Sequence, residues 1–239
     1  MARQVRSEAT RRKILDAAID VFDEVGYTVA GWGTIVKRAG MTKGALYHHF
    51  DAKEPLASAI MDEGSDMLLA AFRNACGSAS PALENMIHGT FAVVNLLSSD
   101  KMSRAAEQLA AALNGFNEAA SRFYANWVPE MAAEARRAIA EGDLRDDVDP
   151  EVVSASIVGA MFGARLLSNA MSGHHKNGVP AGDPTSRLSQ LWELLLPGIA
   201  SEASLPYFRQ FLCRETMRHA RATVAAGEAA AESETATGR

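Results

Sequence analysis

Cysteine is scarce in this 239-residue sequence, and long apolar runs are missing from it. Its two cysteines, Cys76 and Cys213, form no CxxC pair, which argues against a disulfide framework and a structural zinc site. The N-terminus lacks the apolar segment of a signal sequence, and no run approaches the roughly 18 apolar residues of a membrane span. We therefore expect a cytoplasmic protein without a membrane partner.

Strand patterning is absent as well. Apolar residues do not alternate with period two and β-branched residues are sparse, whereas apolar positions recur at helical spacing. The first helical stretch runs from Ile14 to Val25 and ends at Gly26. Further stretches cover residues 34–39, 43–49, 55–75, 83–97, 103–113, 117–140, 150–171 and 185–198. The sequence predicts an all-α protein.

Catalytic and metal-binding motifs are also lacking. There is no GxSxG element and no glycine-rich phosphate loop. The adjacent His174 and His175 have no Cys or carboxylate at zinc-site spacing, and the acidic run at residues 146–149 lacks the central Gly and final Glu of an EF-hand. We expect no enzyme activity, no cofactor and no metal site.

Charge is unevenly distributed, although the chain as a whole carries -5. Residues 1–60 hold nine Lys and Arg against seven Asp and Glu, so the acidic excess lies in the remainder. The first thirteen residues contain one acid, Glu8, and five basic residues: Arg3, Arg6, Arg11, Arg12 and Lys13. A basic arm before a small helical module indicates a nucleic-acid partner.

Two short helices are predicted to meet at Ala39-Gly40-Met41, with Thr42 as N-cap of the second. A small residue and a glycine allow close crossing, as a helix-turn-helix requires when its second helix enters the major groove. The pattern GYxxxxxxxIVxRAGxTKGALYxHFxxKExL, from Gly26 to Leu56, resembles the DNA-binding region of the tetracycline-repressor (TetR) family. The segments MARQVR and MTKGALYHHF, with Trp127 in FYANWVPE, resemble its γ-butyrolactone autoregulator receptor branch in particular.

This resemblance implies three parts along the chain. Residues 1–54 would form a three-helix, helix-turn-helix DNA-binding domain, and residues 55–221 a helical effector-binding and dimerisation domain. Residues 222–239 are low in complexity, and we expect them to be disordered.

The expected DNA contacts fall on the second helix of the motif and on its flanks. Lys43 is expected to pair with a phosphate, and the small residues Thr42, Gly44 and Ala45 let the helix sit deep, where a methyl group can meet a thymine. Tyr47 lies on the same predicted face as Lys43.

Four further residues complete the predicted DNA site. The resemblance implies backbone contacts for His49 as for Tyr47, and Lys53 is expected to act as a second phosphate clamp. Arg3 and Arg6, on a flexible arm, could reach an adjacent minor groove.

The motif departs from the family pattern at residues 30–34, which read AGWGT. The family normally has a Thr or Ser cap there, so the first helix of the motif loses its side-chain cap, which against Ala is worth about 1 kcal/mol. Gly33 costs up to about 1 kcal/mol more if it is helical. We expect a looser helix-turn-helix or an altered half-site.

An effector pocket is predicted from bulky apolar residues on the middle helices, with a few polar groups among them. The candidates are Met86, Phe91, Asn95, Phe123, Trp127, Met131, Met161, Phe162 and Arg165. Apart from Trp127, such residues at helical spacing more often belong to an ordinary core.

A dimer face is predicted on residues 151–171 and 186–197. Small residues in the first segment permit close helix approach, and the second carries a stripe of Leu188, Leu191, Trp192 and Leu195. Two-fold symmetry would set two recognition helices about 34–36 Å apart, as a palindromic site requires.

The sequence thus predicts a cytoplasmic, nucleoid-associated repressor that binds double-stranded operator DNA as a homodimer and is released by a small-molecule effector. A γ-butyrolactone-type signal is the first interpretation of the effector. The alternative is a drug- or metabolite-responsive TetR-type repressor of an efflux or metabolic operon. A helical adaptor that binds only proteins would require the basic arm and the motif to be accidental.

Overall fold

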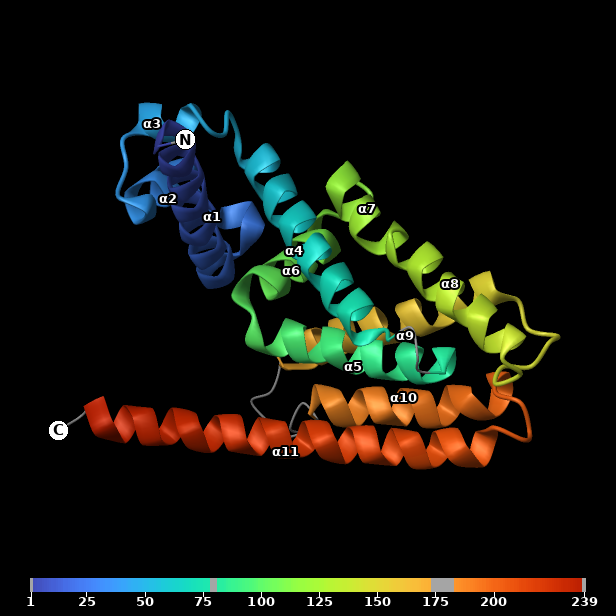
Figure 1. Ribbon diagram of the computed structural model, residues 1–239. Helices are drawn as coiled ribbons and strands as arrows, with labels where there is room; N and C mark the ends of the chain where they lie inside the picture. Colours follow the sequence, from blue (N-terminus) through green and yellow to red (C-terminus); the bar gives the residue numbers. More distant parts are fainter. Residues whose placement is uncertain (1, 78–80, 173–182, 238–239) are drawn as a thin grey trace. The chain divides into compact units, whose positions relative to one another are not determined.

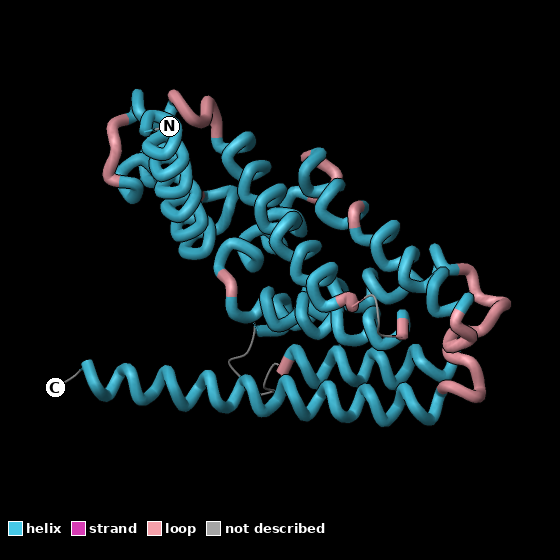
Figure 2. The backbone as a smooth tube through the Cα atoms, in the orientation of Figure 1, coloured by secondary structure: helices cyan, strands magenta, loops and turns pink. Residues whose placement is uncertain are grey.

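The computed structural model describes residues 2–77, 81–172 and 183–237, with side chains for residues 5–77, 81–170 and 183–221. Eleven α-helices form these described parts, which contain no strand beyond a single bridge between Leu144 and Ala200 (Figures 1 and 2). The prediction of an all-α protein is confirmed.

The first of two compact units comprises Met1–Ala70 and Ser99–Asn126. It contains α1 (Ala2–Val29), α2 (Trp32–Ala39), α3 (Lys43–Tyr47), α4 (Lys53–Ala75) as far as Ala70, α6 (Lys101–Leu113) and α7 (Glu118–Ala125). Helix α1 packs against α2 and α6 around fully buried side chains that include Ile14, Leu15, Ile35 and Leu46. Gly64 of α4 lies so close to α6 that a Cβ there would come within 2.3 Å of the Ala106 Cβ.

The second unit comprises Ala71–Ser98 and Trp127–Arg239. Its helices, besides the end of α4, are α5 (Ala82–Ser99), α8 (Trp127–Ala140), α9 (Pro150–Ser172), α10 (Pro184–Ile199) and α11 (Leu205–Thr237). Helix α8 packs along α9, and α10 lies beside α11, the orange and red helices of Figure 1. In its core the indole Nε1 of Trp192 donates to Thr90 Oγ1 at 2.9 Å.

Helix α1 shows one confirmed prediction and one correction. It is broken at Gly26, whose φ of 75° is left-handed, so the predicted end of the helix is confirmed. At its other end α1 begins at Ala2 rather than near Ile14. Residues such as Gln4, Arg6 and Glu8 have good helix propensity, so the expected flexible arm is a helical extension.

Helix α11 was missing from the sequence prediction. Its buried positions Phe208, Leu212 and Glu215 follow helical spacing, but the acid among them interrupts the apolar stripe that would have indicated a helix. The backbone remains helical to Thr237, in contrast to the disorder expected after Arg221. The reason is composition, because this low-complexity segment is rich in Ala and Glu, which favour helix.

The compact units also divide the chain differently from the predicted boundary between residues 54 and 55. The first unit adds most of α4 and all of α6 and α7 to the three N-terminal helices. The predicted helix over residues 117–140 is two helices, α7 and α8, which meet at Asn126.

Helix α9 corrects the expectation about apolar runs. From Pro150 to Ala170 it is long and apolar enough to cross a membrane, judged by length and composition alone. A core helix of a globular protein passes the same test. Here Ser154 Oγ donates to Val128 O at 2.7 Å, and the Phe162 ring contacts the Trp127 ring, so one side of α9 belongs to the packed interior of its unit.

Candidate DNA-binding face and buried tryptophan site

The turn between α2 and α3 follows the helix-turn-helix prediction. Gly40 adopts left-handed φ and ψ of 59° and 39°, and its N–H donates to Lys37 O, which ends α2. Thr42 then caps α3, because its Oγ1 accepts from the Ala45 N–H at 3.2 Å. Leu46 is fully buried and fixes the inner side of α3.

The outer side of α3 is exposed and presents the residues predicted to meet DNA: Thr42, Lys43, Gly44, Ala45 and Tyr47. The Lys43 ammonium lies 5.7 Å from the ring centroid of Tyr47, which is 45% exposed. The Tyr47 ring also packs against Trp32 of α2, with the ring centroids 5.6 Å apart. No atom lies within 4 Å of where a Cβ on Gly44 would stand, so this face is open for close approach.

Helix α2 lacks a side-chain cap, as the departure at residues 30–34 predicted. Its N-cap is Gly31, in an extended conformation with no side-chain hydrogen bond. Gly33 is helical, and a Cβ there would touch nothing within 4 Å. Trp32 is partly buried, and its Nε1 has no hydrogen-bond partner among the described residues. The helix is held instead by its packing on α1, through the buried Ile35 and Ala39 and an ion pair of Arg38 with Glu24.

Lys53 is placed differently from its predicted role as a phosphate clamp. Its Nζ donates to the carbonyl oxygens of Tyr27 at 2.7 Å and Ala30 at 3.0 Å, and it lies 4.4 Å from the centroid of the Tyr27 ring. Lys53 is the first residue of α4 and lies close to the break of α1 at Gly26. Backbone carbonyls at such a break lose their helical hydrogen-bond partners. The side chain therefore ties α4 to the connection between α1 and α2.

The predicted DNA residues that remain are His49, Arg6 and Arg3. His49 is half-buried beside His48, with ring centroids 5.5 Å apart. Arg6 is exposed on helical α1 rather than on a flexible arm. The side chain of Arg3 lies outside the described residues.

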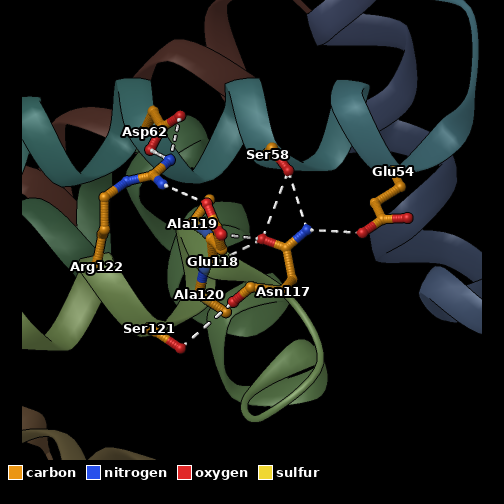
Figure 3. A network of polar contacts seen from close by, with 9 residues as sticks. All are labelled: Glu54, Ser58, Asp62, Asn117, Glu118, Ala119, Ala120, Ser121 and Arg122. Carbon is orange, nitrogen blue, oxygen red and sulfur yellow. Dashed lines mark hydrogen bonds and ion pairs between the residues drawn. The ribbon is translucent and has the colours of Figure 1, made fainter.

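A polar network that the sequence analysis missed joins α7 to the first turns of α4 (Figure 3). Asn117 caps α7 by accepting from the Ala119 N–H at 2.8 Å, and its Nδ2 donates to Ser58 Oγ at 3.0 Å and Glu54 Oε1 at 3.3 Å. One turn further along, Arg122 pairs with Asp62 at 3.0 Å. An Asn followed by an acidic residue before an apolar run is an N-cap signal, so the cap could have been found, although its reach to α4 could not.

Trp127 is fully buried in the second unit, at the start of α8. Its ring makes edge contacts with Phe72 and Phe162, each at 5.9 Å between centroids. Its Nε1 is buried and has no hydrogen-bond partner within the described structure. A buried donor without an acceptor costs about 1–3 kcal/mol, so a ligand atom that accepts from this N–H would recover that free energy.

The other predicted pocket residues do not gather around one space. Met86, Phe91, Met131, Met161 and Phe162 are buried in the second unit, and Phe123 is buried in the first. Met161 and Arg165 line a small cavity of about 50 Å³ between α9 and α10, which also includes Ser168 and Arg187. Asn95 is exposed on α5, and this corrects its assignment as an inward polar anchor.

Comparison with known proteins places this geometry in a family. Residues 14–60 match the model described as "Bacterial regulatory proteins, tetR family", and residues 80–201 match "Tetracyclin repressor-like, C-terminal domain". The A-factor receptor protein of Streptomyces griseus is 32% identical over 209 residues, which cover 87% of this chain and 70% of that protein.

Solved structures agree with these matches. A γ-butyrolactone receptor, described as an ArpA-like protein, superposes with a TM-score of 0.73 at 27% identity, over 89% of this chain and 99% of that one. The TetR-family protein CprB from Streptomyces coelicolor, in complex with its biological operator sequence, gives a TM-score of 0.69 at 27% identity over the same shares. These relatives are DNA-binding regulators without enzymatic activity, and this chain belongs to the TetR family of transcriptional repressors, related to the γ-butyrolactone receptors.

Proposed function

We propose that this protein binds a palindromic operator as a homodimer and releases it when a small molecule of the γ-butyrolactone type binds. The observation that carries the DNA part is the exposed face of α3, where Lys43 and Tyr47 stand beside the small Gly44 and Ala45 while Leu46 anchors the opposite side. A lysine and a phenol can contact phosphates, and the small residues admit the base edges. A repressor of this kind works in the cytoplasm, on the nucleoid.

The homodimer is supported by an apolar surface on the second unit. Val152, Leu166 and Leu167 of α9 are each about 60% exposed, and Leu194 of α10 is 78% exposed. The small residues Ala155 and Gly159 share this side of α9 and are exposed too. A contiguous apolar face of this kind is typical of an interface, and a second copy of the chain would cover it.

The predicted interface changes in one respect. Trp192 and Leu188, which were expected to face the partner, are buried in the core of their own unit. The stripe on α10 packs inward because Trp192 finds its acceptor in Thr90 of α5. Leu194, on the outer side of α10, takes their place in the proposed interface.

The effector site is proposed at Trp127. A lactone carbonyl or ring oxygen can accept from the unpartnered Nε1, and the neighbouring aromatic side chains of Phe72 and Phe162 suit an acyl chain. A pocket would open there by displacement of side chains, since the indole is fully buried without ligand.

A route from this site to the DNA runs along the chain itself. Trp127 lies two residues after the last residue of α7, and Asn117 at the other end of α7 is bonded to Ser58 and Glu54 of α4. The first residue of α4, Lys53, holds the connection before α2. A shift of α7 would therefore reach the helix-turn-helix through hydrogen-bonded contacts.

The runner-up is a repressor that responds to a drug or metabolite. The contacts around Trp127 are aromatic and apolar, and a lining of this kind accepts many apolar compounds, which supports this alternative. A screen separates the two, since γ-butyrolactones and unrelated apolar compounds can be compared in the same release assay.

The test uses fluorescence anisotropy with DNA from upstream of the protein's own gene and a scrambled duplex. Nanomolar, salt-dependent preference for the upstream DNA, lost on addition of a γ-butyrolactone, is the expected result. Trp127→Phe should keep the DNA affinity and lose release. Equal weak binding to both duplexes would contradict the operator, and full release from the Trp127→Phe variant would contradict the effector site.

The dimer has its own test in sedimentation velocity. Leu194→Glu places a charge in the proposed interface and should give a monomer that binds DNA at least tenfold more weakly. Arg145→Glu, an exposed change outside this face, is the matched control and should stay dimeric. A wild-type monomer, or a dimer that persists in Leu194→Glu, would contradict this interface.

A further inference from the structure

Two histidines and a buried glutamate meet in the second unit, where α5 packs beside α11. His88 Nδ1 lies 2.7 Å from Glu215 Oε2, and His219 Nε2 lies 3.5 Å from the same oxygen. One potential ligand atom from each of the three residues falls within 4.8 Å of the others. No part of the proposed repressor mechanism uses these groups.

We propose that His88, Glu215 and His219 form a binding site for one divalent transition-metal ion of the zinc type. Two imidazoles and one carboxylate are the ligands of many three-residue zinc sites, and such sites keep a fourth position open. Neighbouring ligand atoms around a tetrahedral zinc ion lie about 3.3–3.6 Å apart, as follows from bonds of about 2.0–2.2 Å. The His219–Glu215 distance already suits this geometry, and the closer His88–Glu215 contact would widen by a rotamer adjustment.

The helices already hold the three side chains close together, so little rearrangement is needed when a metal ion binds. Glu215 and His219 are four residues apart on α11 and so share one helix face. The His219 ring stacks on Phe91 of α5 at 5.1 Å and 22°, which fixes its plane. His88 joins them from one turn before Phe91.

One oxygen of the buried Glu215 carboxylate faces the two imidazoles. The side chain of this glutamate is only 1% exposed, and a buried carboxylate requires partners. Arg218 takes the other oxygen, Oε1, at 2.7 Å, which orients the carboxylate and leaves Oε2 toward the two imidazoles. An outer-shell partner of this kind is a regular feature of metal sites.

An open position for a fourth ligand lies beside the cluster. A cavity of about 330 Å³ is lined by His88, Glu215 and Arg218, together with polar groups of Asn74 and Glu84. Water in this cavity can complete the coordination. The bound ion would join α5 to α11 and thereby stabilise the second unit, independently of the effector site at Trp127.

The experiment uses the full-length protein with any affinity tag removed, stripped with EDTA and dialysed against Zn²⁺. Bound metal is measured by mass spectrometry, affinity by competition with a chromophoric chelator, and coordination by the visible spectrum of a Co²⁺-loaded sample. We expect one ion per chain and a rise in Tm on Zn²⁺ addition. His88→Ala and His219→Gln should each weaken binding at least tenfold and abolish the rise in Tm.

Two double variants serve as matched controls for adventitious binding by histidine pairs. His48→Ala with His49→Ala, and His174→Ala with His175→Ala, should keep the ion. Should His219→Gln fail to fold by circular dichroism, His88→Ala carries the test, because its side chain is 34% exposed and tolerates truncation. Substoichiometric binding, or binding that survives in the His88→Ala variant, would overturn the site and leave the cluster as a hydrogen-bonded ion pair.

Discussion

The ammonium of Lys53 lies 2.7 Å from the carbonyl oxygen of Tyr27 and 3.0 Å from that of Ala30. The first residue of α4 is thus bonded to the segment that follows the helix break at Gly26. A lysine that the sequence assigns to a phosphate thus donates hydrogen bonds to backbone carbonyl oxygens within the first unit. Its contacts connect the helix-turn-helix to the helix that would move it.

Replacement of Lys53 by Met should separate these two roles. The variant removes the donor of the Tyr27, Thr28 and Ala30 carbonyl oxygens, and we expect the free energy of unfolding to fall by about 1–3 kcal/mol. A lysine that neutralises one phosphate would instead reduce the slope of log affinity against log salt by about one. Urea unfolding and a salt series on operator binding measure both quantities, and a reduced slope with unchanged stability would show that Lys53 is a phosphate contact.

Alanine in place of the two helical glycines near the DNA face should stabilise both variants but weaken DNA binding in only one of them. Gly33→Ala removes a helix-interior glycine where a Cβ meets nothing, and it should stabilise the protein by up to about 1 kcal/mol without loss of DNA binding. Gly44→Ala should gain similar stability but lower operator affinity severalfold, because its methyl group stands on the outer face of α3. Thermal melts with anisotropy titrations compare them, and equal DNA affinity in the two variants would contradict the orientation of α3.

The Asn117 network predicts a coupling variant. Asn117→Asp keeps the oxygen that caps α7 but loses the N–H groups donated to Ser58 and Glu54, and its charge repels Glu54. We expect wild-type DNA affinity and a higher effector concentration for half-release. Ser121→Asp, which adds the same negative charge at an exposed position of α7, is the control for the effect of charge alone. Unchanged release in Asn117→Asp would exclude this route.

His219 predicts how the stability of the second unit depends on pH. Burial is the main cause that lowers its pKa below the ordinary 6.5, with His88 and Arg218 adding to the effect and Glu215 opposing it. The unfolded chain therefore binds a proton more readily, and the stabilising contribution is complete above pH 6.5 and lost as the pH falls through the lower folded pKa. In EDTA, urea unfolding between pH 7.5 and 5 should show a steeper fall for wild type than for His219→Gln. Parallel curves would rule out this origin of the acid sensitivity.

The local chemistry of the helix-turn-helix was predictable from the sequence. Gly26 and Gly40 end helices because they supply left-handed backbone, and Thr42 caps α3 because a short hydroxyl reaches the N–H of Ala45. The sequence also predicted that α2 lacks a side-chain cap, because Gly31 stands at the N-cap position and has no side chain. These features depend on neighbours a few residues away, which a sequence pattern records.

Contacts between distant residues were not predictable in the same way. The Lys53 ammonium meets carbonyls more than twenty residues earlier, and Trp192 turns inward because Thr90 of another helix accepts its N–H. The cluster at His88 was overlooked because its partners lie far along the chain, on a helix whose buried face includes an acid. Apolar spacing identifies a buried face, but it does not identify the helix that covers it.

Operator binding by two single variants of α3 tests the central claim most directly. Lys43→Ala alters an exposed side chain and should keep the wild-type Tm, whereas Tyr47→Ala also removes the ring contact with Trp32 and should lower the Tm slightly. Both proteins should keep the wild-type dimer mass. Anisotropy titrations against the preferred DNA should show at least tenfold weaker binding for each, with a lower salt slope for Lys43→Ala. Wild-type affinity in both folded variants would contradict the assignment of α3 as the helix that contacts the operator.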